Sequence, residues 1–410
     1  MRWLYAIVFS LAFAVPCAPA FEAVGTLQGI DLDKGVIRLH ANGQDRTVPY
    51  AADVQVVGTN GAPLADGLRS PLLKDGAEIS VSVDRGAKGP TIGAIRLGHQ
   101  AGGAASNTMA PTGGKTSVGF KPLTEMTATD RYKGEDGGLY GGGLNAPPPA
   151  LQAVAARATA RIVPLDAEGK PATNGTIGLV SISMSNATME YSRFKELADA
   201  DPRKSWRVTI VDCAQGGQAM AQWVDPQARP WLEADRRLAH AGVSPRQVQV
   251  IWVKLANVHP TGELAEHGRK LERDTQALLQ NAKARFPNLR IAYLGSRIYA
   301  GYASTPLNPE PYAYEGAFAA RWLIQDQMKG APELAYDDTK GEAKVPLALW
   351  GPYFWGDGTT PRQADHLVWE PQDLGGDGTH PSPRGREKVA GMLLSFFTTD
   401  QLARTWFVKP

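Results

Sequence analysis

The sequence predicts an α/β domain built around a parallel sheet, preceded by a small all-β domain. Two observations predict this fold class: short alternating apolar runs near the N-terminus, and apolar runs that alternate with helical stretches from about residue 158 onward. At roughly 100 to 200 residues per domain, the 410 residues suffice for two or three domains. Lys plus Arg (43) nearly balance Asp plus Glu (41), which argues against chain-wide electrostatic binding of nucleic acid or acidic membranes.

Residues 1–20 have the features of a signal peptide. Arg2 gives a basic start, an apolar run extends from Trp3 to Val15, and Ala18-Pro19-Ala20 forms a small-x-small cleavage site. The apolar run is too short to span a bilayer, and no other segment is apolar enough to do so. The sequence therefore predicts an exported protein, periplasmic or secreted, without membrane insertion. Cleavage would leave Cys213 as the one thiol, so no disulfide scaffold is expected.

Residues 21–99 predict the small β domain. Runs with a period of two, bounded by Gly, Asp-Gly and Asn-Gly, are typical of a small antiparallel barrel or sandwich. Two roles are open for this domain: binding of a polymer, or packing against the next domain. The second is favoured because the runs carry no aromatic or charged binding face. The runs are Gly35–His40, Asp53–Val57, Glu78–Val83 and Thr91–Ile95.

Residues 100–150 predict a Gly/Pro-rich linker. They show almost no apolar periodicity and contain the triplets Gly141–Gly143 and Pro147–Pro149. Tyr132 and Tyr140 lie among the glycines, and they leave open that part of this segment covers the following domain.

Residues 151–410 predict the α/β domain. Apolar runs that end in polar turns alternate with helical stretches, the clearest of which extends from about residue 262 to 285. Strands separated by helices form a parallel sheet covered on both faces, that is, a three-layer α/β/α domain. In such sheets the site lies beyond the carboxyl ends of the strands. The runs are Gly178–Ile182, Arg207–Val211, Val248–Val253 and Leu289–Leu294, and an apolar helix covers Val389–Phe397.

The residues that follow these strands supply the groups that acyl transfer requires. Ser185 follows the first strand, a glycine turn follows the second, and Asn257 follows the third. Asp377 and His380 precede the C-terminal helix. A serine can attack an acyl carbon, a histidine can take the serine proton, a carboxylate can fix the imidazole tautomer, and amide N–H groups can receive the oxyanion.

In this order the blocks resemble those of the SGNH (GDSL-like) hydrolase superfamily, over roughly residues 175–400. Asp377-Gly378-Thr379-His380-Pro381 is similar to the last block of that family, and Ser183–Asn186 looks like the Gly-Gln-Ser-Asn variant of its carbohydrate-acetylesterase branch. The third block departs from the family pattern, since Leu255 and Val258 replace its usual Gly and Asp.

The resemblance implies a role for each block. Ser185 would be the nucleophile, His380 the general base and Asp377 the residue that orients it. The oxyanion hole would consist of the N–H of Ser185, the N–H of Gly217 and the side-chain amide of Asn257, with Gly216 as the rival of Gly217. No cofactor and no metal are expected.

Each of these residues also has a structural interpretation. Taken alone, Ser185 is more typical of a helix N-cap, with Glu190 nearby, than of a nucleophile, and Asp212 is typical of a turn. Among other histidines, His259 is a weaker candidate base that could line the site, and His267 is expected to be exposed on its helix. The joint occurrence at successive strand ends favours catalysis.

Aromatic residues are enriched between Tyr299 and Trp369, including Trp350 and Trp355. Such residues either stack on sugar rings or form the core of a long insertion, and the core is favoured. The sequence thus predicts an exported serine esterase that removes O-acetyl or similar acyl groups from carbohydrate through an acyl-enzyme. The alternatives are a non-catalytic glycan-binding or scaffold protein on the same fold, and a polysaccharide O-acetyltransferase.

Overall fold

The computed structural model describes residues 18–41, 44–58, 63–86, 89–97, 110–111 and 113–409. The chain divides into two compact units, residues 1–100 and 101–410, and each is described by itself. Residues 1–17 of the predicted signal peptide lie outside the described residues, whereas Ala18–Ala20 begin the first strand.

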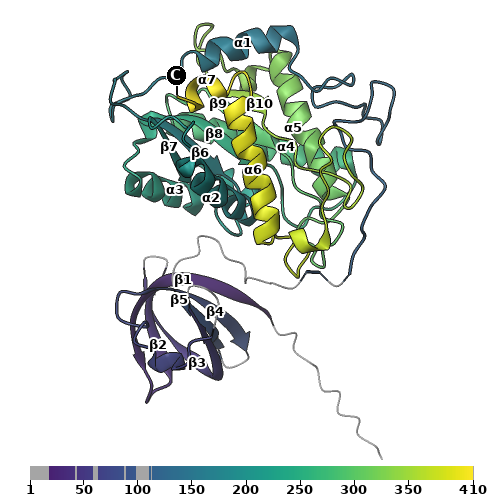
Figure 1. The fold of residues 1–410 in the computed structure, drawn as a ribbon. Helices are drawn as coiled ribbons and strands as arrows, with labels where there is room; N and C mark the ends of the chain where they lie inside the picture. The colour runs from purple at the N-terminus through teal and green to yellow at the C-terminus, as the bar shows by residue number, and fades with distance from the viewer. Residues whose placement is uncertain are drawn as a thin grey trace, which may run out of the picture. The chain divides into compact units, whose positions relative to one another are not determined.

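The N-terminal unit is a closed five-stranded barrel (Figure 1). The strand order is β1-β2-β3-β5-β4, and the pair β3–β5 is parallel whereas the other four pairs are antiparallel. Apolar side chains such as Ile37, Ile79 and Ile95 alternate along the strands and fill the interior. Of the two predicted architectures, the barrel is therefore the one observed. Its elements are β1 (Ala18–Asp31), β2 (Val36–Ala41), β3 (Gln44–Val57), η1 (Gly67–Arg69), β4 (Glu78–Gly86) and β5 (Gly89–Leu97).

Of the two possibilities left open for residues 100–150, the part from residue 113 onward follows the second and covers the α/β unit. This segment lacks helices and strands up to residue 148, but it packs on the α/β unit through the buried side chains of Leu123, Met126 and Tyr140. The Ser117 hydroxyl and the N–H groups of Val118 and Gly119 donate hydrogen bonds to Asp357. Sequence periodicity missed the packing because an irregular segment buries apolar residues at no fixed spacing.

The C-terminal unit contains a five-stranded parallel sheet in the order β10-β9-β8-β6-β7. Four strands agree with the predicted apolar runs, and the short edge strand β10 was not predicted. Every residue of β6, β8, β9 and β10 is buried, as expected for a sheet covered on both faces. The strands are β6 (Ile177–Ile182), β7 (Val208–Asp212), β8 (Val248–Lys254), β9 (Ile291–Gly295) and β10 (Leu347–Trp350).

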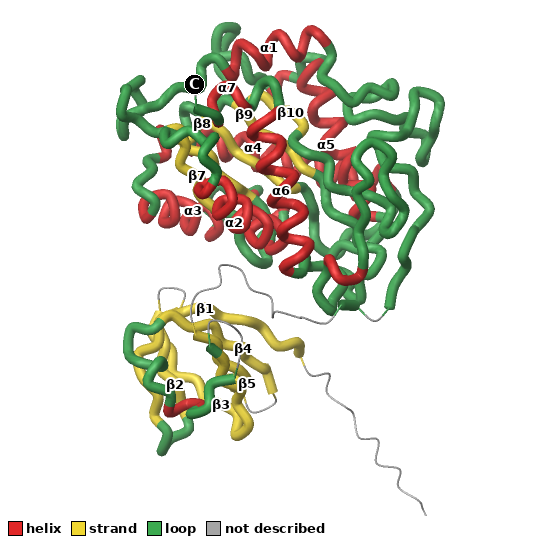
Figure 2. Tube along the Cα trace, in the orientation of Figure 1, coloured by secondary structure: helices red, strands yellow, loops and turns green. Residues whose placement is uncertain are grey.

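Helices cover both faces of this sheet (Figure 2). The helices α2 and α6 pack together on one face, and α4 packs with α5 on the other. The α-helices are α1 (Pro149–Thr159), α2 (Ser185–Ala200), α3 (Arg229–His240), α4 (Leu264–Arg285), α5 (Tyr312–Met328), α6 (Pro383–Thr399) and α7 (Arg404–Phe407). The 3₁₀ helices are η2 (Met220–Trp223), η3 (Pro245–Gln247), η4 (Pro332–Leu334) and η5 (Pro371–Asp373).

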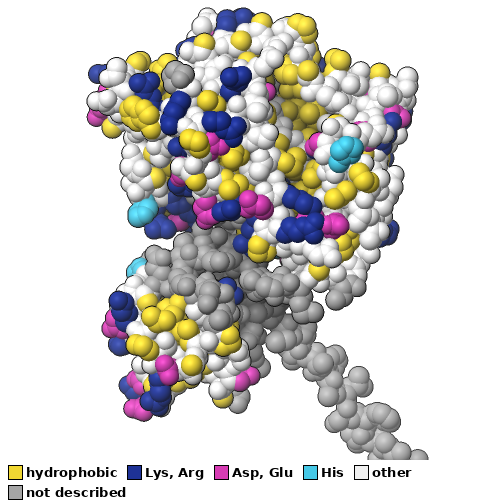
Figure 3. Space-filling view, viewed as in Figure 1, with side chains coloured by type: hydrophobic (Ala, Val, Ile, Leu, Met, Phe, Trp, Pro, Cys, Tyr) yellow, Lys and Arg dark blue, Asp and Glu magenta, His cyan; other side chains and the backbone are white. Residues whose placement is uncertain are grey.

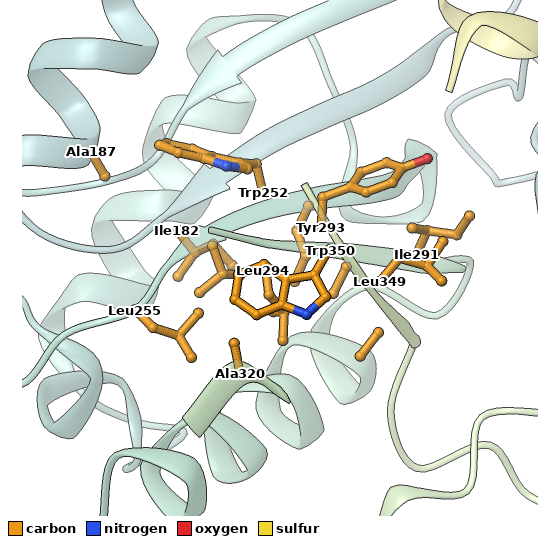
Figure 4. Close-up of a cluster of buried hydrophobic side chains, with 14 of the residues drawn as sticks. Ile182, Ala187, Trp252, Leu255, Ile291, Tyr293, Leu294, Ala320, Leu349 and Trp350 are labelled. Atoms are coloured by element: carbon orange, nitrogen blue, oxygen red, sulfur yellow. The ribbon is translucent and has the colours of Figure 1, made fainter. Parts of the chain in front are cut away.

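Successive residues of the strands enter opposite halves of the core (Figure 4). Trp252 of β8 stacks on Tyr191 of α2, with ring centroids 5.5 Å apart. Leu294 and Trp350 lie on the other side of the sheet, toward Ala320 of α5. The parallel strands are thereby fixed between the helices, and their carboxyl ends are held at one edge.

The aromatic residues between Tyr299 and Trp369 belong to the core. Tyr299, Trp355 and Trp369 are fully buried, and Tyr314 packs against Trp355 with ring centroids 4.7 Å apart. The favoured interpretation is therefore confirmed for most of this cluster, whereas Tyr312 and Tyr336 are only partly buried.

The surface carries mixed charge. On the face shown in Figure 3, Lys and Arg side chains are interspersed with Asp and Glu, in line with the near-balanced composition. Among the described residues, no helix combines the length and the apolar character that crossing a membrane requires.

Candidate active site

Ser185 is the first residue of α2 and directly follows the turn after β6. The N-cap of α2 is Met184, which makes no side-chain capping hydrogen bond. Instead of capping the helix, the Ser185 hydroxyl lies 2.8 Å from Nε2 of His380, which is 195 residues away in the chain. The N-cap interpretation of Ser185 is therefore wrong.

His380 connects the serine to a carboxylate. Its Nδ1 lies 2.5 Å from Oδ2 of Asp377, so the three side chains form a continuous hydrogen-bonded chain. An Nδ1–H that donates to Asp377 leaves Nε2 as an acceptor, and this is the tautomer that can take a proton from the serine. Both His380 and Asp377 lie in the irregular segment between η5 and α6.

The local fold holds Asp377 in its ionised form. Burial by itself raises the pKa of Asp377, but the hydrogen bond and charge of His380 outweigh it and lower the pKa to about 2. Oδ1 also accepts hydrogen bonds from the backbone N–H groups of Thr379 and His380, each at 3.0 Å. Gly378, between Asp377 and Thr379, has a φ of 62°, a left-handed conformation that glycine adopts without strain. The carboxylate is thus charged and oriented throughout the neutral pH range.

Three loops from successive strand ends meet beside Ser185. Met184, Ala219 and Ala256 pack together as a small buried cluster, one from each of the loops after β6, β7 and β8. The carbonyl of Ser183 accepts a hydrogen bond of 2.9 Å from the N–H of Gln215, and this bond ties the first loop to the second. The packing therefore brings the glycine turn and the Asn257 loop to the same edge of the sheet as Ser185.

Two of the predicted oxyanion donors are backbone N–H groups. The first intrahelical bond of α2 runs from the N–H of Thr188 to the carbonyl of Met184, so the N–H of Ser185 has no partner within the helix. It also lies at the positive end of the helix dipole. The N–H groups of Gly216 and Gly217 make no hydrogen bond within the described part of the chain. Gly217 has a φ of 74°, so the loop depends on a glycine there.

Asn257 is held firmly, with one amide hydrogen already engaged. Its Oδ1 accepts a hydrogen bond from the N–H of Ala221 at 3.0 Å, and its Nδ2 donates to Asp274 at 2.6 Å. A side-chain amide has two N–H groups, so the second remains available for a substrate oxygen. No direct contact joins Asn257 to Ser185 or His380 among the hydrogen bonds of the described residues.

Sequence reasoning missed two residues that hold the histidine loop. The carbonyl of Thr379, in the peptide bond before His380, accepts hydrogen bonds from Nδ2 of Asn186 (2.9 Å) and from the guanidinium of Arg297 (3.4 Å). Both donors are buried. The signal for Arg297 was its position just after the fourth strand, where the rule on carboxyl strand ends also applies.

A buried ion pair lies behind the first turns of α2. Nζ of Lys254, the last residue of β8, lies 2.5 and 2.6 Å from the two carboxylate oxygens of Glu190, and both side chains are fully buried. Burial lowers the pKa of Lys254 to about 8 and raises that of Glu190. The Ser183 hydroxyl also donates to the carbonyl of Lys254. This pair therefore connects the first turns of α2, which begins at Ser185, to the centre of the sheet.

Three other residues considered in the sequence analysis, Asp212, His267 and Cys213, have structural roles in the fold. Asp212 is more than a turn residue, because it accepts hydrogen bonds from the hydroxyls of Ser181, Thr188 and Ser192. His267 was expected to be exposed, but it is buried and paired with Glu315. The Glu315 carboxylate provides the hydrogen-bond partner that water would provide for an exposed histidine. Cys213 is fully buried, and burial raises the pKa of its thiol, as expected for a packed small residue.

His259 lies on a cavity of about 460 Å³ next to Asn257. The cavity is lined by residues of η2, the loop after β8, α4 and the start of α5, among them Gln222, Asn308 and Tyr312. Neither Ser185 nor His380 lines this cavity.

Comparison with known proteins gave matches in structure alone. No family model matches the sequence, and no curated protein matches it. A proposed acylhydrolase from Bacteroides fragilis NCTC 9343 is 13% identical, with 60% of this chain and 96% of that chain covered and a TM-score of 0.32. The periplasmic domain of a lipopolysaccharide acetyltransferase from Salmonella ser. Paratyphi A is 14% identical, with 55% and 83% covered and a TM-score of 0.30. Apo-CusF residues 6–88 from Escherichia coli is 14% identical, with 22% and 100% covered and a TM-score of 0.16.

Proposed function

We propose that the chain is an exported serine esterase that removes O-acetyl or similar acyl groups from carbohydrate through an acyl-enzyme on Ser185. The observation that carries the proposal is the hydrogen-bonded series from Ser185 Oγ through the His380 ring to Asp377. Such a series activates a hydroxyl that is otherwise a weak nucleophile at neutral pH. Export rests on the signal-peptide features of residues 1–20.

The first half-reaction forms the acyl-enzyme. The Ser185 oxygen attacks the acyl carbon of the ester, and its proton passes to Nε2 of His380. The negative charge of the tetrahedral intermediate falls on the former carbonyl oxygen, which the N–H groups of Ser185, Gly217 and Asn257 would receive. The bond to the alcohol oxygen then breaks, and His380 returns the proton to that oxygen as the alcohol leaves. Asp377 stays ionised and balances the charge of the imidazolium.

The second half-reaction releases the acid. A water molecule attacks the acyl carbon and gives a proton to His380, and the histidine then protonates Ser185 as the acid departs. If a sugar hydroxyl replaces the water, the same residues transfer the acyl group to a polymer. The hydrolase and the O-acetyltransferase therefore differ only in the acceptor, and the ratio of acid released to acyl group transferred, measured with added polysaccharide, distinguishes them.

Replacing the nucleophile tests the proposal. Ser185→Ala removes the attacking oxygen without leaving a buried charge unpaired, so turnover of 4-nitrophenyl acetate should fall by at least 10³-fold, the order expected when such a triad loses a member. Circular dichroism should show an unchanged fold. A fluorophosphonate probe should label wild type and not Ser185→Ala. Retained turnover, or equal labelling of both proteins, refutes Ser185 as the nucleophile, whereas a wild-type protein that neither hydrolyses the ester nor is labelled favours the non-catalytic alternative.

A further inference from the structure

We infer that Asn186 is a positioning residue of the proposed triad and holds the His380 imidazole at bonding distance from the Ser185 hydroxyl. It acts through the carbonyl of Thr379, in the peptide bond before His380. This inference rests on the proposed function, and it assigns a role to a residue that neither attacks the ester nor transfers a proton. It stands on the contacts that hold the histidine loop, residues 377–380.

The histidine loop is held together from within by Asp377. One carboxylate oxygen accepts from the backbone N–H groups of Thr379 and His380, and the other lies 2.5 Å from Nδ1 of the ring. Ring and backbone therefore form one unit, whose internal geometry is set by residues next to one another in the chain. These bonds do not determine where the unit lies relative to Ser185, so that position depends on contacts from other segments.

Asn186 supplies a contact from the helix that carries Ser185. Its Nδ2 donates a hydrogen bond of 2.9 Å to the carbonyl of Thr379, and the side chain is 2% exposed. Ser185 and Asn186 are neighbours in α2, and their partners His380 and Thr379 are neighbours in the histidine loop. Within the described part of the chain, these are the two hydrogen bonds between α2 and the loop. Two adjacent bonds fix an orientation that a single bond leaves free to rotate.

Further contacts of the histidine loop come from a segment that does not carry Ser185. The guanidinium of Arg297 also donates to the Thr379 carbonyl, at 3.4 Å, and the N–H of Ser304 donates to the carbonyl of Asp377 at 3.0 Å. Both donors lie between β9 and α5. Without the amide at position 186, the Thr379 carbonyl therefore keeps a donor and is not left buried and unpaired. Loss of that amide should shift the loop relative to α2 rather than unfold the chain.

The expected effect on the rate follows from the serine–histidine distance. Oγ of Ser185 and Nε2 of His380 are 2.8 Å apart, and proton transfer to a base needs about 2.6–3.2 Å. A shift of about 1 Å takes the pair out of this range, and a misplacement of that size costs about 10²-fold in rate. His380 serves as the base in both proposed half-reactions, so both should slow together. We therefore expect kcat of Asn186→Ala to fall about 10- to 100-fold, with KM within about threefold of wild type.

A double-mutant cycle tests whether Asn186 acts through His380. The hydrolysis of 4-nitrophenyl acetate is measured for wild type, Asn186→Ala, His380→Ala and the double variant, with the rate of Ser185→Ala subtracted as background. Without the imidazole there is nothing left to position, so His380→Ala and the double variant should have the same kcat within about twofold. If Asn186 acted only on the stability of α2 or on the N–H of Ser185, its loss would slow both backgrounds alike. Such an equal loss, or no loss in Asn186→Ala, overturns the positioning role.

Two further variants separate the hydrogen bond from the packing. Asn186→Leu fills nearly the same space without a donor, so it should lose as much kcat as Asn186→Ala, and it replaces that variant in the cycle if circular dichroism shows the alanine protein unfolded. Wild-type kcat in Asn186→Leu would overturn the role of the amide. Asn288→Ala is the matched control, because Nδ2 of Asn288 also donates to a backbone carbonyl, that of Arg246 at 2.8 Å, but this residue precedes β9, at the opposite edge of the sheet from Ser185. Asn288→Ala should keep wild-type kcat, and a loss equal to that of Asn186→Ala would refute the assignment.

A crystal structure of Asn186→Ala decides the inference even if no ester is hydrolysed. The distance from Oγ of Ser185 to Nε2 of His380 should exceed about 3.5 Å in this variant and stay within hydrogen-bonding reach in wild type and in Asn288→Ala. An unchanged distance in Asn186→Ala overturns the positioning role. A wild-type protein without turnover, together with a lengthened distance in the variant, would refute the proposed function and leave the positioning contact standing.

Discussion

The most informative perturbation of the proposed mechanism is Asp377→Asn. In wild type, Oδ1 of Asp377 accepts the N–H groups of Thr379 and His380, each at 3.0 Å, and Oδ2 accepts Nδ1–H of His380 at 2.5 Å. An asparagine has only one oxygen. If its NH₂ group faced the two backbone N–H groups, three donors would meet with no acceptor between them. The asparagine oxygen should therefore stay beside these N–H groups, and the NH₂ group should face Nδ1 of His380.

This orientation reverses the histidine tautomer. Nδ1 of His380 would have to accept from the asparagine, so its proton would move to Nε2, the atom that lies 2.8 Å from the Ser185 hydroxyl. An Nε2–H cannot take the serine proton, and general-base catalysis is lost although the geometry is kept. A general base contributes about 10² to 10⁴-fold, and an oxyanion hole keeps working without it. We therefore expect kcat to fall by about 10³ to 10⁴-fold, with little change in KM.

The assay is the initial rate of 4-nitrophenyl acetate hydrolysis at pH 7, with Ser185→Ala as the floor. Asp166→Asn is the matched control, because Asp166 lies in a turn before β6 and its Oδ1 accepts the N–H of Lys170, which asparagine can also do. The control should keep wild-type rates. An Asp377→Asn protein within fivefold of the wild-type kcat would refute the tautomer argument and remove Asp377 from the proposed triad.

Three further predictions follow from the same site. Asn257→Ala should lower kcat about 10² to 10³-fold if its free amide hydrogen receives the oxyanion, and an unchanged kcat would exclude this residue from the oxyanion hole. Lys254→Met leaves the fully buried Glu190 unpaired and should lower the free energy of unfolding in urea by about 3–5 kcal/mol. The double variant Lys254→Met, Glu190→Leu should recover most of this lost stability. If the two substitutions instead lowered the stability additively, the pairing argument would be contradicted. The pKa of Asp377 is about 2 in the folded chain, which is lower than in the unfolded chain. The ionised Asp377 carboxylate therefore adds roughly 2 kcal/mol to the free energy of unfolding above about pH 4, and this stabilisation is lost as the pH falls toward 2. The free energies of unfolding of wild type and Asp377→Asn, measured in urea, should therefore converge as the pH falls over that range. A difference that stays constant would contradict the lowered pKa.

Period-two and buried apolar runs were enough to predict β6, β7, β8 and β9 and most of the barrel, because burial on one or both faces of a sheet leaves a local pattern. Order along the chain also identified Ser185 as a candidate, since polar residues after successive parallel strands meet at one edge. Asp377 and His380 were candidates through the Asp-Gly-Thr-His motif before the C-terminal helix. The packing of the segment from residue 113 onward left no such pattern, because its burial follows no period.

The sequence by itself determined which chemical groups follow the strands and where the chain folds into sheet and helix. Only the tertiary structure decided that the Ser185 hydroxyl bonds to His380 rather than capping α2. It also decided that Arg297 and Asn186 donate to the Thr379 carbonyl, and that most of the aromatic cluster is buried. The physical reason is that hydrogen bonds between residues nearly 200 positions apart depend on how sheet and helices pack, and packing is set by the whole core rather than by any local segment.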